Sequence, residues 1–211
     1  MGSKDLKTVA AQLRKPHGAL GKEAGEMMNK GNERMNLAAI EQLDIETNDN
    51  ILEIGMGNGF FVRHILANDN SIRYDGCDFS DLMVEEAIIR NEEYVSNGQA
   101  RFTWADAMDL PYRDESFNKV FTVNTIYFWD EKEIVLAEIK RVLKKDGLLI
   151  ISLRSKAVMD DLPVTKYGFK TFSKTDCIEL LPRHGFQILG ATEQEDLDIE
   201  LSISGELKKH V

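Results

Sequence analysis

Short apolar runs alternate with longer stretches of helical periodicity along most of the 211-residue chain. Runs typical of strands cover residues 50–54, 72–78, 100–105, 119–124, 148–153, 186–192 and 197–204. Between these runs, apolar side chains recur at helical spacing, most clearly in residues 130–145. Strands that alternate with helices in this way predict βαβ units and a parallel sheet.

Capping residues predict where the helices begin and end. Helices are expected over residues 60–67, 80–91, 130–145 and 173–184. Ser80 and Ser173 are suited to the N-cap position, because a side-chain hydroxyl accepts a hydrogen bond from a free amide of the first turn. Gly147 and Gly185 follow two of the helices, and glycine readily adopts the left-handed conformation that ends a helix.

The last two predicted strands, 186–192 and 197–204, are separated by only a short acidic turn. Strands so close in sequence pair as an antiparallel hairpin, because a parallel crossover needs a dozen or more residues. The sequence therefore predicts a doubly wound, Rossmann-like α/β fold with a seven-stranded sheet, mostly parallel with an antiparallel last strand. In such a fold the ligand crevice lies outside the carboxyl ends of the first strands.

Residues 1–45 precede this core and are expected to form an N-terminal helical lid or cap over a ligand-binding domain, 46–211. Asn32 and Asn36, one helical turn apart, are candidates to line the pocket. Residues 154–172 are a second candidate lid. The first 35 residues carry seven Lys/Arg and four Asp/Glu, whereas the whole chain has a net charge of −10. This basic arm is suited either to docking on the acidic body or to attracting an anionic substrate.

A glycine loop follows the first predicted strand. Residues 53–59 have the sequence Glu-Ile-Gly-Met-Gly-Asn-Gly, and a helix is expected directly after them. Glycines allow positive φ angles and close approach of a ligand, and the start of a helix offers free N–H groups. A dinucleotide fingerprint needs a small residue at position 60, where this chain has Phe60. The loop therefore favours a ligand without a pyrophosphate, such as the amino-acid portion of a sulfonium nucleoside.

Two aspartates end the next two predicted strands. Asp78 lies 23 residues beyond Gly55, and a carboxylate at this place can accept hydrogen bonds from both hydroxyls of a ribose. Asp106 ends the third strand and is expected to accept a hydrogen bond from the amino group of adenine, while Ala107 offers its N–H to a ring nitrogen. Each aspartate alone would be an ordinary loop residue. The order of loop, acid and acid favours a nucleoside site.

Four segments in this order resemble the class I S-adenosylmethionine-dependent methyltransferases, in particular the small-molecule branch similar to the ubiquinone/menaquinone biosynthesis methyltransferases. The segments are 51–59, 75–80, 106–112 and 138–147, and the resemblance covers roughly residues 45–154. The chain departs from the family pattern at Asn118, where aspartate is common, and at residues 145–147, where Pro-Gly-Gly is frequent. Both departures lie in structural turns, and they weaken the assignment to a subfamily.

The resemblance implies that S-adenosylmethionine binds as the cofactor and leaves as S-adenosylhomocysteine. It also implies a seven-stranded sheet with an antiparallel last strand, and it supports the roles given above to the glycine loop and the two aspartates. The residues expected to bind the cofactor are Glu53, Gly55, Met56, Gly57, Gly59, Asp78, Phe79, Ser80, Asp106, Ala107, Asn124 and Thr125.

No motif assigns the catalytic residues, because methyl transfer from a sulfonium needs little beyond an aligned nucleophile and a site without water. In the resembled fold, the loop after the fourth strand lies beside the methyl group. Tyr127, Phe128 and Trp129 in this loop are expected either to line the acceptor pocket or to pack in the core. Tyr127 and His17 are the candidate catalytic residues. Alternatively, the segment around His17 forms a lid without chemistry.

Several other kinds of site are not indicated. Cys77 and Cys177 form no CxxC pair, and the four histidines show no metal-ligand spacing, so neither a disulfide framework nor a metal site is predicted. The negative net charge disfavours nucleic acid as a partner. No apolar run approaches the roughly 18 residues of a membrane span, and the first residues lack a signal-peptide pattern. We therefore expect a cytoplasmic protein without a membrane partner.

The sequence predicts an enzyme that transfers the methyl group of S-adenosylmethionine, by in-line displacement, to a small-molecule acceptor. No motif indicates the methylated atom, C, N, O or S, or the oligomeric state. One alternative is a non-catalytic S-adenosylmethionine-binding regulatory protein, which would keep the loop and the acids but lack an acceptor pocket. The other is an NAD-dependent oxidoreductase, against which Phe60 argues.

Overall fold

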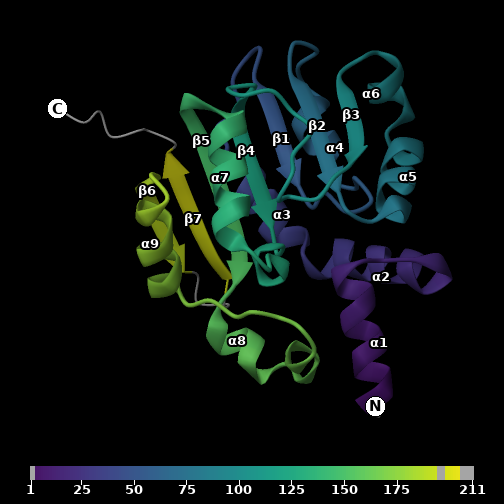
Figure 1. Cartoon of the computed structure of the whole chain (residues 1–211). Helices are drawn as coiled ribbons and strands as arrows, with labels where there is room; N and C mark the ends of the chain where they lie inside the picture. Colours follow the sequence, from purple (N-terminus) through teal and green to yellow (C-terminus); the bar gives the residue numbers. More distant parts are fainter. Residues whose placement is uncertain (1–2, 194–197, 205–211) are drawn as a thin grey trace.

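A seven-stranded sheet with helices on both faces organises the described part of the chain (Figure 1). The computed structural model of the protein describes residues 3–193 and 198–204. In spatial order the strands are β3-β2-β1-β4-β5-β7-β6. Their bounds are β1 Asn50–Ile54, β2 Arg73–Asp78, β3 Ala100–Trp104, β4 Phe117–Val123, β5 Leu143–Arg154, β6 Gln187–Glu193 and β7 Asp198–Ser204.

Strands β1 to β5 run parallel to one another, which confirms the expected Rossmann-like α/β class with a mostly parallel sheet. Beyond β5, the strand β7 pairs antiparallel with both β5 and β6. The strand order reverses at β1, which has β2 on one side and β4 on the other. Such a switch point predicts a ligand crevice at the carboxyl ends of these strands. Residues 194–197, where the sequence predicts an acidic turn, lie outside the described residues.

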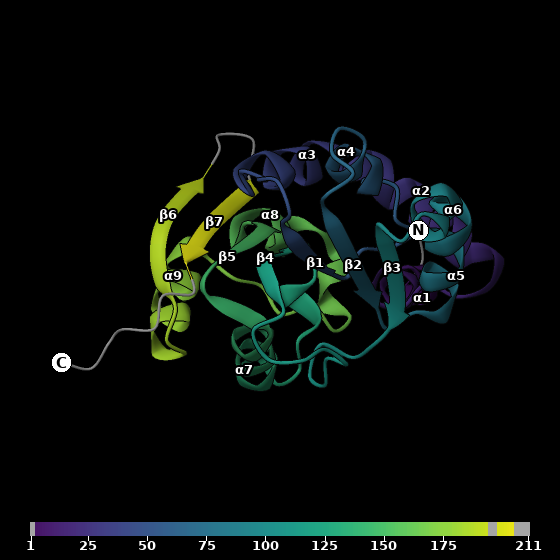
Figure 2. The same cartoon turned by 90° about the horizontal axis from the view of Figure 1, so that it is seen from above.

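Helices cover both faces of the sheet. Their bounds are α1 Ser3–Arg14, α2 Gly18–Gly31, α3 Glu33–Gln42, α4 Val62–Leu66, α5 Asp81–Arg90, α6 Glu92–Ser96, α7 Lys132–Val142, α8 Lys156–Asp161 and α9 Lys174–Arg183, with 3-10 turns η1 Ile126–Phe128 and η2 Pro163–Lys166. Helices α3, α4 and α5 pack on one face, and α7 and α9 pack on the other (Figure 2). In the described part of the chain, none of these helices has the length and apolar character to cross a membrane.

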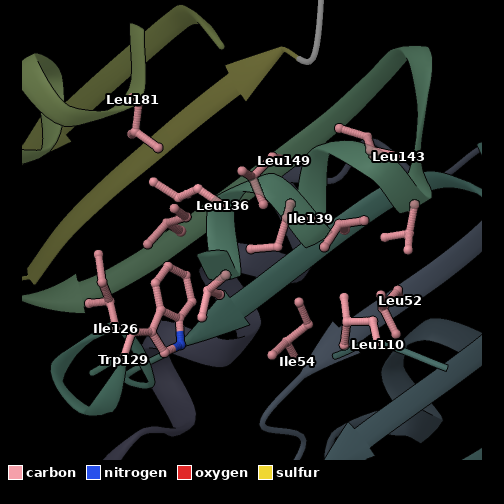
Figure 3. Packing of buried hydrophobic residues seen from close by; sticks show 14 of the residues in the cluster. Leu52, Ile54, Leu110, Ile126, Trp129, Leu136, Ile139, Leu143, Leu149 and Leu181 are labelled. Atoms are coloured by element: carbon pink, nitrogen blue, oxygen red, sulfur yellow. The ribbon is translucent and has the colours of Figure 1, made fainter. Parts of the chain in front are cut away.

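The core consists of two apolar layers, one on each face of the sheet. Successive side chains of a strand point to opposite faces, so Ile51 joins the layer under α3 and α4 while Leu52 joins the layer under α7. Figure 3 shows Leu136 and Ile139 of α7 packed over Leu149 of β5. Because both faces are covered, the central strands are continuous apolar runs, and this is why they were recognisable in the sequence.

Most predicted helix ends are confirmed and one is wrong. Ser80 and Ser173 cap α5 and α9, and each side chain accepts a hydrogen bond from an amide of the first turn. Gly185 follows α9 with a φ of +82°. By contrast, α7 ends earlier than predicted, and Gly147 lies inside β5 without a positive φ. A Cβ on Gly147 would lie 2.9 Å from the Asn118 carbonyl oxygen, so close packing against β4 explains this glycine.

Of the N-terminal helices, α3 lies on a face of the sheet, whereas α1 and α2 lie at the carboxyl ends of the strands. Helix α3 packs against β4 and β5, α2 packs against α5, and α1 extends beyond the strand ends, where it contacts η2 (Figure 1). The two candidate lid segments therefore meet. The ion pairs Arg14–Asp130 and Lys22–Glu86 link the basic arm to acidic side chains of the body. These contacts favour the docking interpretation of the arm.

Candidate functional site

A cavity lies at the carboxyl ends of β1 to β4, between the sheet and the N-terminal helices. The strand ends line it with Glu53, Gly55, Met56, Gly57, Asp78, Phe79, Asp106, Ala107, Met108, Asn124 and Thr125. The N-terminal segment lines it with Leu13, Arg14, Pro16, Met28, Asn29, Asn32 and Asn36. The cavity thus occupies the crevice that the strand order predicts, and Asn32 and Asn36 line it as expected.

The structure brings together most of the residues expected to bind a cofactor. Among them, Gly59 and Ser80 are the two that do not line the cavity. Gly59 packs against α5, and Ser80 is buried at the start of that helix. The remaining residues come from four different strand ends, so their meeting in one cavity follows from the fold. Their roles toward a cofactor stay predictions.

The three loop glycines Gly55, Gly57 and Gly59 all have positive φ angles, of +76°, +57° and +67°. A Cβ on Gly59 would lie 3.0 Å from the Ala87 Cβ, so this glycine lets the loop approach α5. A Cβ on Gly57 would meet no other atom within 4 Å. Gly57 is therefore required by its backbone angle, and its side toward the cavity is open to a ligand.

Asp78 is held by backbone amides on both of its carboxylate oxygens. Its Oδ2 accepts a hydrogen bond from the Gly57 N–H (3.1 Å), and its Oδ1 accepts one from the Ser80 N–H (2.9 Å). Burial raises the pKa of Asp78 to about 6, while these amides and the charge of Lys15 lower it. The carboxylate is thus mostly ionised at neutral pH and fixed between the glycine loop and α5.

Glu53 is more deeply buried than Asp78, with 4% of the residue exposed. Its Oε2 accepts a hydrogen bond from the Tyr74 hydroxyl at 2.5 Å. Burial raises the pKa of Glu53 from 4.5 to about 7; the bond from Tyr74 opposes this shift, and the charge of Asp78 adds to it. Two carboxylates close enough to influence each other therefore line the cavity. A positively charged ligand would stabilise the ionised form of both.

The loop after β3 supplies the third predicted acid. Asp106 is exposed at the cavity, and its Oδ1 accepts a hydrogen bond from the Met108 N–H at 2.9 Å. The Trp104 indole N–H, at the end of β3, donates to the carbonyl oxygen of Phe79 (2.8 Å). This bond joins the ends of β2 and β3 and fixes the backbone of Phe79, whose side chain lines the same cavity.

The end of β4 is held by side-chain hydrogen bonds. Asn124 has a φ of +58°, and its Oδ1 accepts a hydrogen bond from the Tyr127 hydroxyl at 2.8 Å. Tyr127 is 2% exposed and does not line the cavity, whereas Phe128 and Trp129 do. Of the two alternatives for these aromatic residues, Tyr127 therefore packs in the core while its two neighbours form part of the wall.

His17, the other candidate catalytic residue, lies outside the cavity lining. It is exposed at the N-cap of α2, and its backbone N–H donates to the Gln12 side chain at 2.9 Å. Two of its neighbours do line the cavity, namely Arg14 and Pro16. Arg14 forms an ion pair with Asp130, which follows η1 and lines the cavity as well, at 2.5 Å.

Several lining residues were not found from the sequence. Asp130 belongs to no recognisable motif. Met28 and Asn29 lie four and three residues before Asn32, near the end of α2. This helical spacing could have indicated that the three side chains share a face. Asn58 of the glycine loop also lines the cavity; it is 4% exposed, and its Oδ1 has no hydrogen-bond partner among the described residues.

Known proteins resemble the chain in sequence over the segment that contains these strand ends. Residues 52–151 match a family model described as a methyltransferase domain. YrhH of Bacillus subtilis is 34% identical over 114 residues, which cover 54% of this chain and 62% of YrhH. The O-methyltransferase resE of Aspergillus sclerotiorum is 31% identical over 127 residues, covering 60% of this chain and 48% of that protein. The chain thus spans about half to three fifths of these relatives.

The fold is also similar to that of solved structures. A SAM-dependent methyltransferase from Aquifex aeolicus superposes with a TM-score of 0.69 at 15% sequence identity. The match covers 97% of this chain and 98% of that protein. At this level of identity the likeness concerns the fold alone.

Proposed function

We propose that the chain, whose residues 52–151 match the methyltransferase-domain model, is a class I S-adenosylmethionine-dependent methyltransferase and transfers the methyl group of S-adenosylmethionine to a small-molecule acceptor. One observation carries the proposal: residues 53–58 of the glycine loop, Asp78 and Asp106 line a single cavity at the switch point of the sheet. Each was expected to contact a different part of one nucleoside ligand. In the proposed function, the glycine loop, Asp78 and Asp106 lie in one cavity because they bind the same ligand.

The lining residues suit the cofactor in charge, and the glycine loop leaves room for it. In the proposed arrangement Asp78 accepts hydrogen bonds from the ribose, and the loop containing Asp106 and Ala107 receives the adenine beside Phe79. The methionine end then lies along Gly55–Gly57, where the open side of Gly57 leaves room for it. The sulfonium and ammonium groups of the ligand are cationic, and Glu53 and Asp78 supply carboxylates that balance them.

The cofactor supplies an activated methyl group, so the chain has to position the acceptor and exclude water. Apolar side chains from opposite sides of the cavity, Met28 of α2 and Phe128 and Trp129 after β4, are placed to do both. We propose that residues 1–45 act as the lid or cap of a methyltransferase domain, 46–211. Support comes from α1 and α2, which line the cavity opposite the strand ends.

A small-molecule acceptor is supported by two observations. The cavity is bounded by helices on the side facing away from the sheet, and a chain with a net charge of −10 is repelled by nucleic-acid phosphates. The name of resE describes it as an O-methyltransferase, which makes hydroxyl compounds the first acceptors to test. A non-catalytic regulatory protein would bind the same cofactor without turnover.

Calorimetric titration with S-adenosylhomocysteine, with NADH as the control, tests the cofactor assignment. We expect micromolar affinity for the first ligand and none for NADH. Methyl transfer is then measured with methyl-labelled S-adenosylmethionine and a panel of hydroxylated aromatic and aliphatic compounds. If the folded protein binds no S-adenosylhomocysteine, the proposal is wrong. If it binds this ligand but methylates none of a broad range of O, N, S and C acceptors, the regulatory alternative is favoured.

A further inference from the structure

The residues at the junction of α1 and α2 contact the loop after β4 and the residues that follow β2. We call residues 14–17 the strap. Arg14 forms its ion pair with Asp130, after β4. The Lys15 Nζ lies 5.3 Å from the centroid of the Phe79 ring, and the carbonyl oxygen of Pro16 accepts a hydrogen bond from the Ser80 hydroxyl at 2.6 Å. Figure 1 shows the neighbouring helices α1 and α2 at the carboxyl ends of the strands.

These three contacts differ in strength because they differ in burial. Both members of the Arg14–Asp130 pair are substantially exposed, and exposed ion pairs contribute little to stability. Lys15 is also exposed, so water weakens its attraction to the ring of Phe79. Ser80 is 0% exposed, and a buried carbonyl that loses its donor is unfavourable. The hydroxyl of Ser80 is therefore the main attachment of the strap.

Ser80 also touches the residue proposed to hold the ribose. Its N–H donates to Asp78 Oδ1 at 2.9 Å, and its Oγ accepts the bond from the Met83 N–H that caps α5. The carboxylate of Asp78 and the carbonyl of Pro16 are thus linked through one residue. Any ligand that fixes Asp78 also fixes the turn from which the Ser80 hydroxyl reaches the strap.

The strap is held to the helix on each side of it. The buried side chain of Gln12 accepts a hydrogen bond from the His17 N–H at 2.9 Å. Gly18, which follows, has a φ of +60°, and a Cβ there would meet nothing within 4 Å. Glycine is therefore required here by its backbone angle. On the other side, the carbonyl oxygen of His17 accepts a hydrogen bond from the Gly21 N–H of α2 at 3.0 Å.

We propose that Ser80 is a positioning residue that couples binding of the cofactor to closure of the strap over the cavity. This inference rests on the proposed function. A ligand bound between Asp78 and Phe79 on one side and Arg14 and Pro16 on the other is covered by the closed strap and cannot leave until the strap opens. Coupling between two events is reciprocal. If closure of the strap raises the affinity for the ligand by a given factor, the bound ligand shifts the equilibrium toward the closed strap by the same factor.

Trypsin provides a direct readout of strap opening. The Arg14–Lys15 bond is a trypsin site inside the strap, whereas the next bond, Lys15–Pro16, is resistant because proline follows the lysine. In the intact protein we expect S-adenosylhomocysteine to slow cleavage after Arg14 by about tenfold, within the usual range of coupling between sites. Mass spectrometry identifies the product, and calorimetry on the same sample confirms that the ligand is bound.

The Ser80→Ala variant is expected to lose most of this protection and to release S-adenosylhomocysteine about tenfold faster. Ser80→Thr, which keeps a hydroxyl, is expected to restore both. Ser173→Ala is the matched control, because it removes the N-cap of α9 far from the strap. It should leave protection and release unchanged. Lys15→Ala, at an exposed position, tests the coupling without disturbing the buried turn and is expected to reduce protection partially.

Two results would overturn the inference. In one, the wild-type protein binds S-adenosylhomocysteine but is cleaved after Arg14 at the same rate with and without it. In the other, Ser80→Ala and Ser173→Ala lose protection equally, which would mean that loss of a helix cap, rather than of the strap contact, is responsible. Absence of ligand binding to folded wild-type protein is a different result, since it contradicts the proposed function itself.

Discussion

Glu53 shows how a single buried side chain links stability to ligand binding. Its strongest described contact is the neutral hydroxyl of Tyr74, so its negative charge is poorly compensated inside the protein. This is the physical reason why burial raises the pKa of Glu53 to about 7. The ligand-free protein is therefore destabilised at neutral pH by the same carboxylate that suits a cationic ligand.

The sign of this effect on stability follows from the two pKa values. In the unfolded chain Glu53 titrates near 4.5, and in the folded protein near 7, so the folded state holds its proton more tightly between these values. The contribution of Glu53 to the free energy of unfolding is therefore largest below about pH 4.5 and is lost as the pH rises through 7. We expect Glu53→Gln to stabilise the ligand-free protein at pH 7.5 by roughly 1–3 kcal/mol. Thermal unfolding of both proteins at pH 5.5 and 7.5 measures this, and a variant no more stable at pH 7.5 would contradict it.

A second residue-scale prediction concerns Asp78. Asp78→Ala is expected to weaken binding of S-adenosylhomocysteine by roughly 1–3 kcal/mol, because the ribose hydroxyls lose their acceptor. Asp75→Ala is the control, since Asp75 lies on the same strand, pairs with Arg101 and does not line the cavity. Calorimetry gives both affinities. Equal losses in the two variants would remove Asp78 from the site.

The sequence identified the residues that follow strands more successfully than those that reach the cavity from elsewhere. Gly55, Asp78 and Asp106 each follow an apolar run, and parallel strands bring their carboxyl ends to one edge. Asp130 lies at the end of the loop after β4 rather than directly after the strand, and its partner Arg14 comes from the arm, which is distant in sequence. Tyr127 was ambiguous for a different reason: an aromatic residue beside a strand end is equally suited to a wall or to the core.

At the scale of elements, helix α2 is held on α5 by two ion pairs in register. Lys22 pairs with Glu86 at 2.6 Å, and Glu26 pairs with Arg90 at 2.5 Å, so partners four residues apart match on both helices. The pKa of Lys22 is raised, chiefly by its hydrogen bond to Glu86. These side chains are partly exposed, so salt screens their attraction. The docking of the lid helix should therefore respond to charge more than the core does.

Reversing one charge tests this docking. Lys22→Glu places like charges opposite each other, and we expect amide hydrogen exchange in α2 to accelerate by roughly two- to fivefold, the range of exposed ion pairs. The midpoint of global unfolding should change little, because the core is untouched. The swap Lys22→Glu with Glu86→Lys restores opposite charges and should return exchange to the wild-type rate. Exchange that is unchanged in the single variant would show that the pair does not hold α2.

The elements themselves were mostly predictable, and the exceptions have physical causes. Ser173 and Gly185 mark the ends of α9 because capping chemistry is local. Gly147 misled the prediction because a glycine after a helical pattern is usually a cap, whereas here the nearby carbonyl of Asn118 excludes a side chain. A glycine can be required by a positive φ angle or by the closeness of another atom. Which of the two applies depends here on a neighbouring strand, and the local sequence does not show that neighbour.

At the scale of the whole molecule, the proposed cofactor would bridge the strand ends and the N-terminal arm. The cavity is lined by four strand ends and by the arm, so a ligand there binds the folded protein and not the unfolded chain. At a concentration of one hundred times its dissociation constant, S-adenosylhomocysteine should add about 2.7 kcal/mol to the free energy of unfolding. For a chain of this size that corresponds to a rise in melting temperature of about 5–10 °C.

A thermal shift assay measures this rise, with NADH at the same concentration as the control. A melting temperature that does not respond to saturating S-adenosylhomocysteine would contradict the cofactor site.

The fold class itself was predictable from the alternation of apolar runs and helical periodicity. The placement of the arm was not, because it depends on contacts such as that of Ser80 with Pro16, which are 64 positions apart in sequence.

The position of β7 has a consequence for synthesis on the ribosome. This strand lies between β5 and β6, which precede it in the chain, and among the described strands β6 pairs only with β7. Until residues 198–204 have been synthesised, β5 forms an open edge of the sheet and the β6 segment has no strand to pair with. Unpaired edges of this kind are prone to association with other chains. Completion of the sheet therefore has to wait for the last of its seven described strands, although the strands that form the cavity are already available.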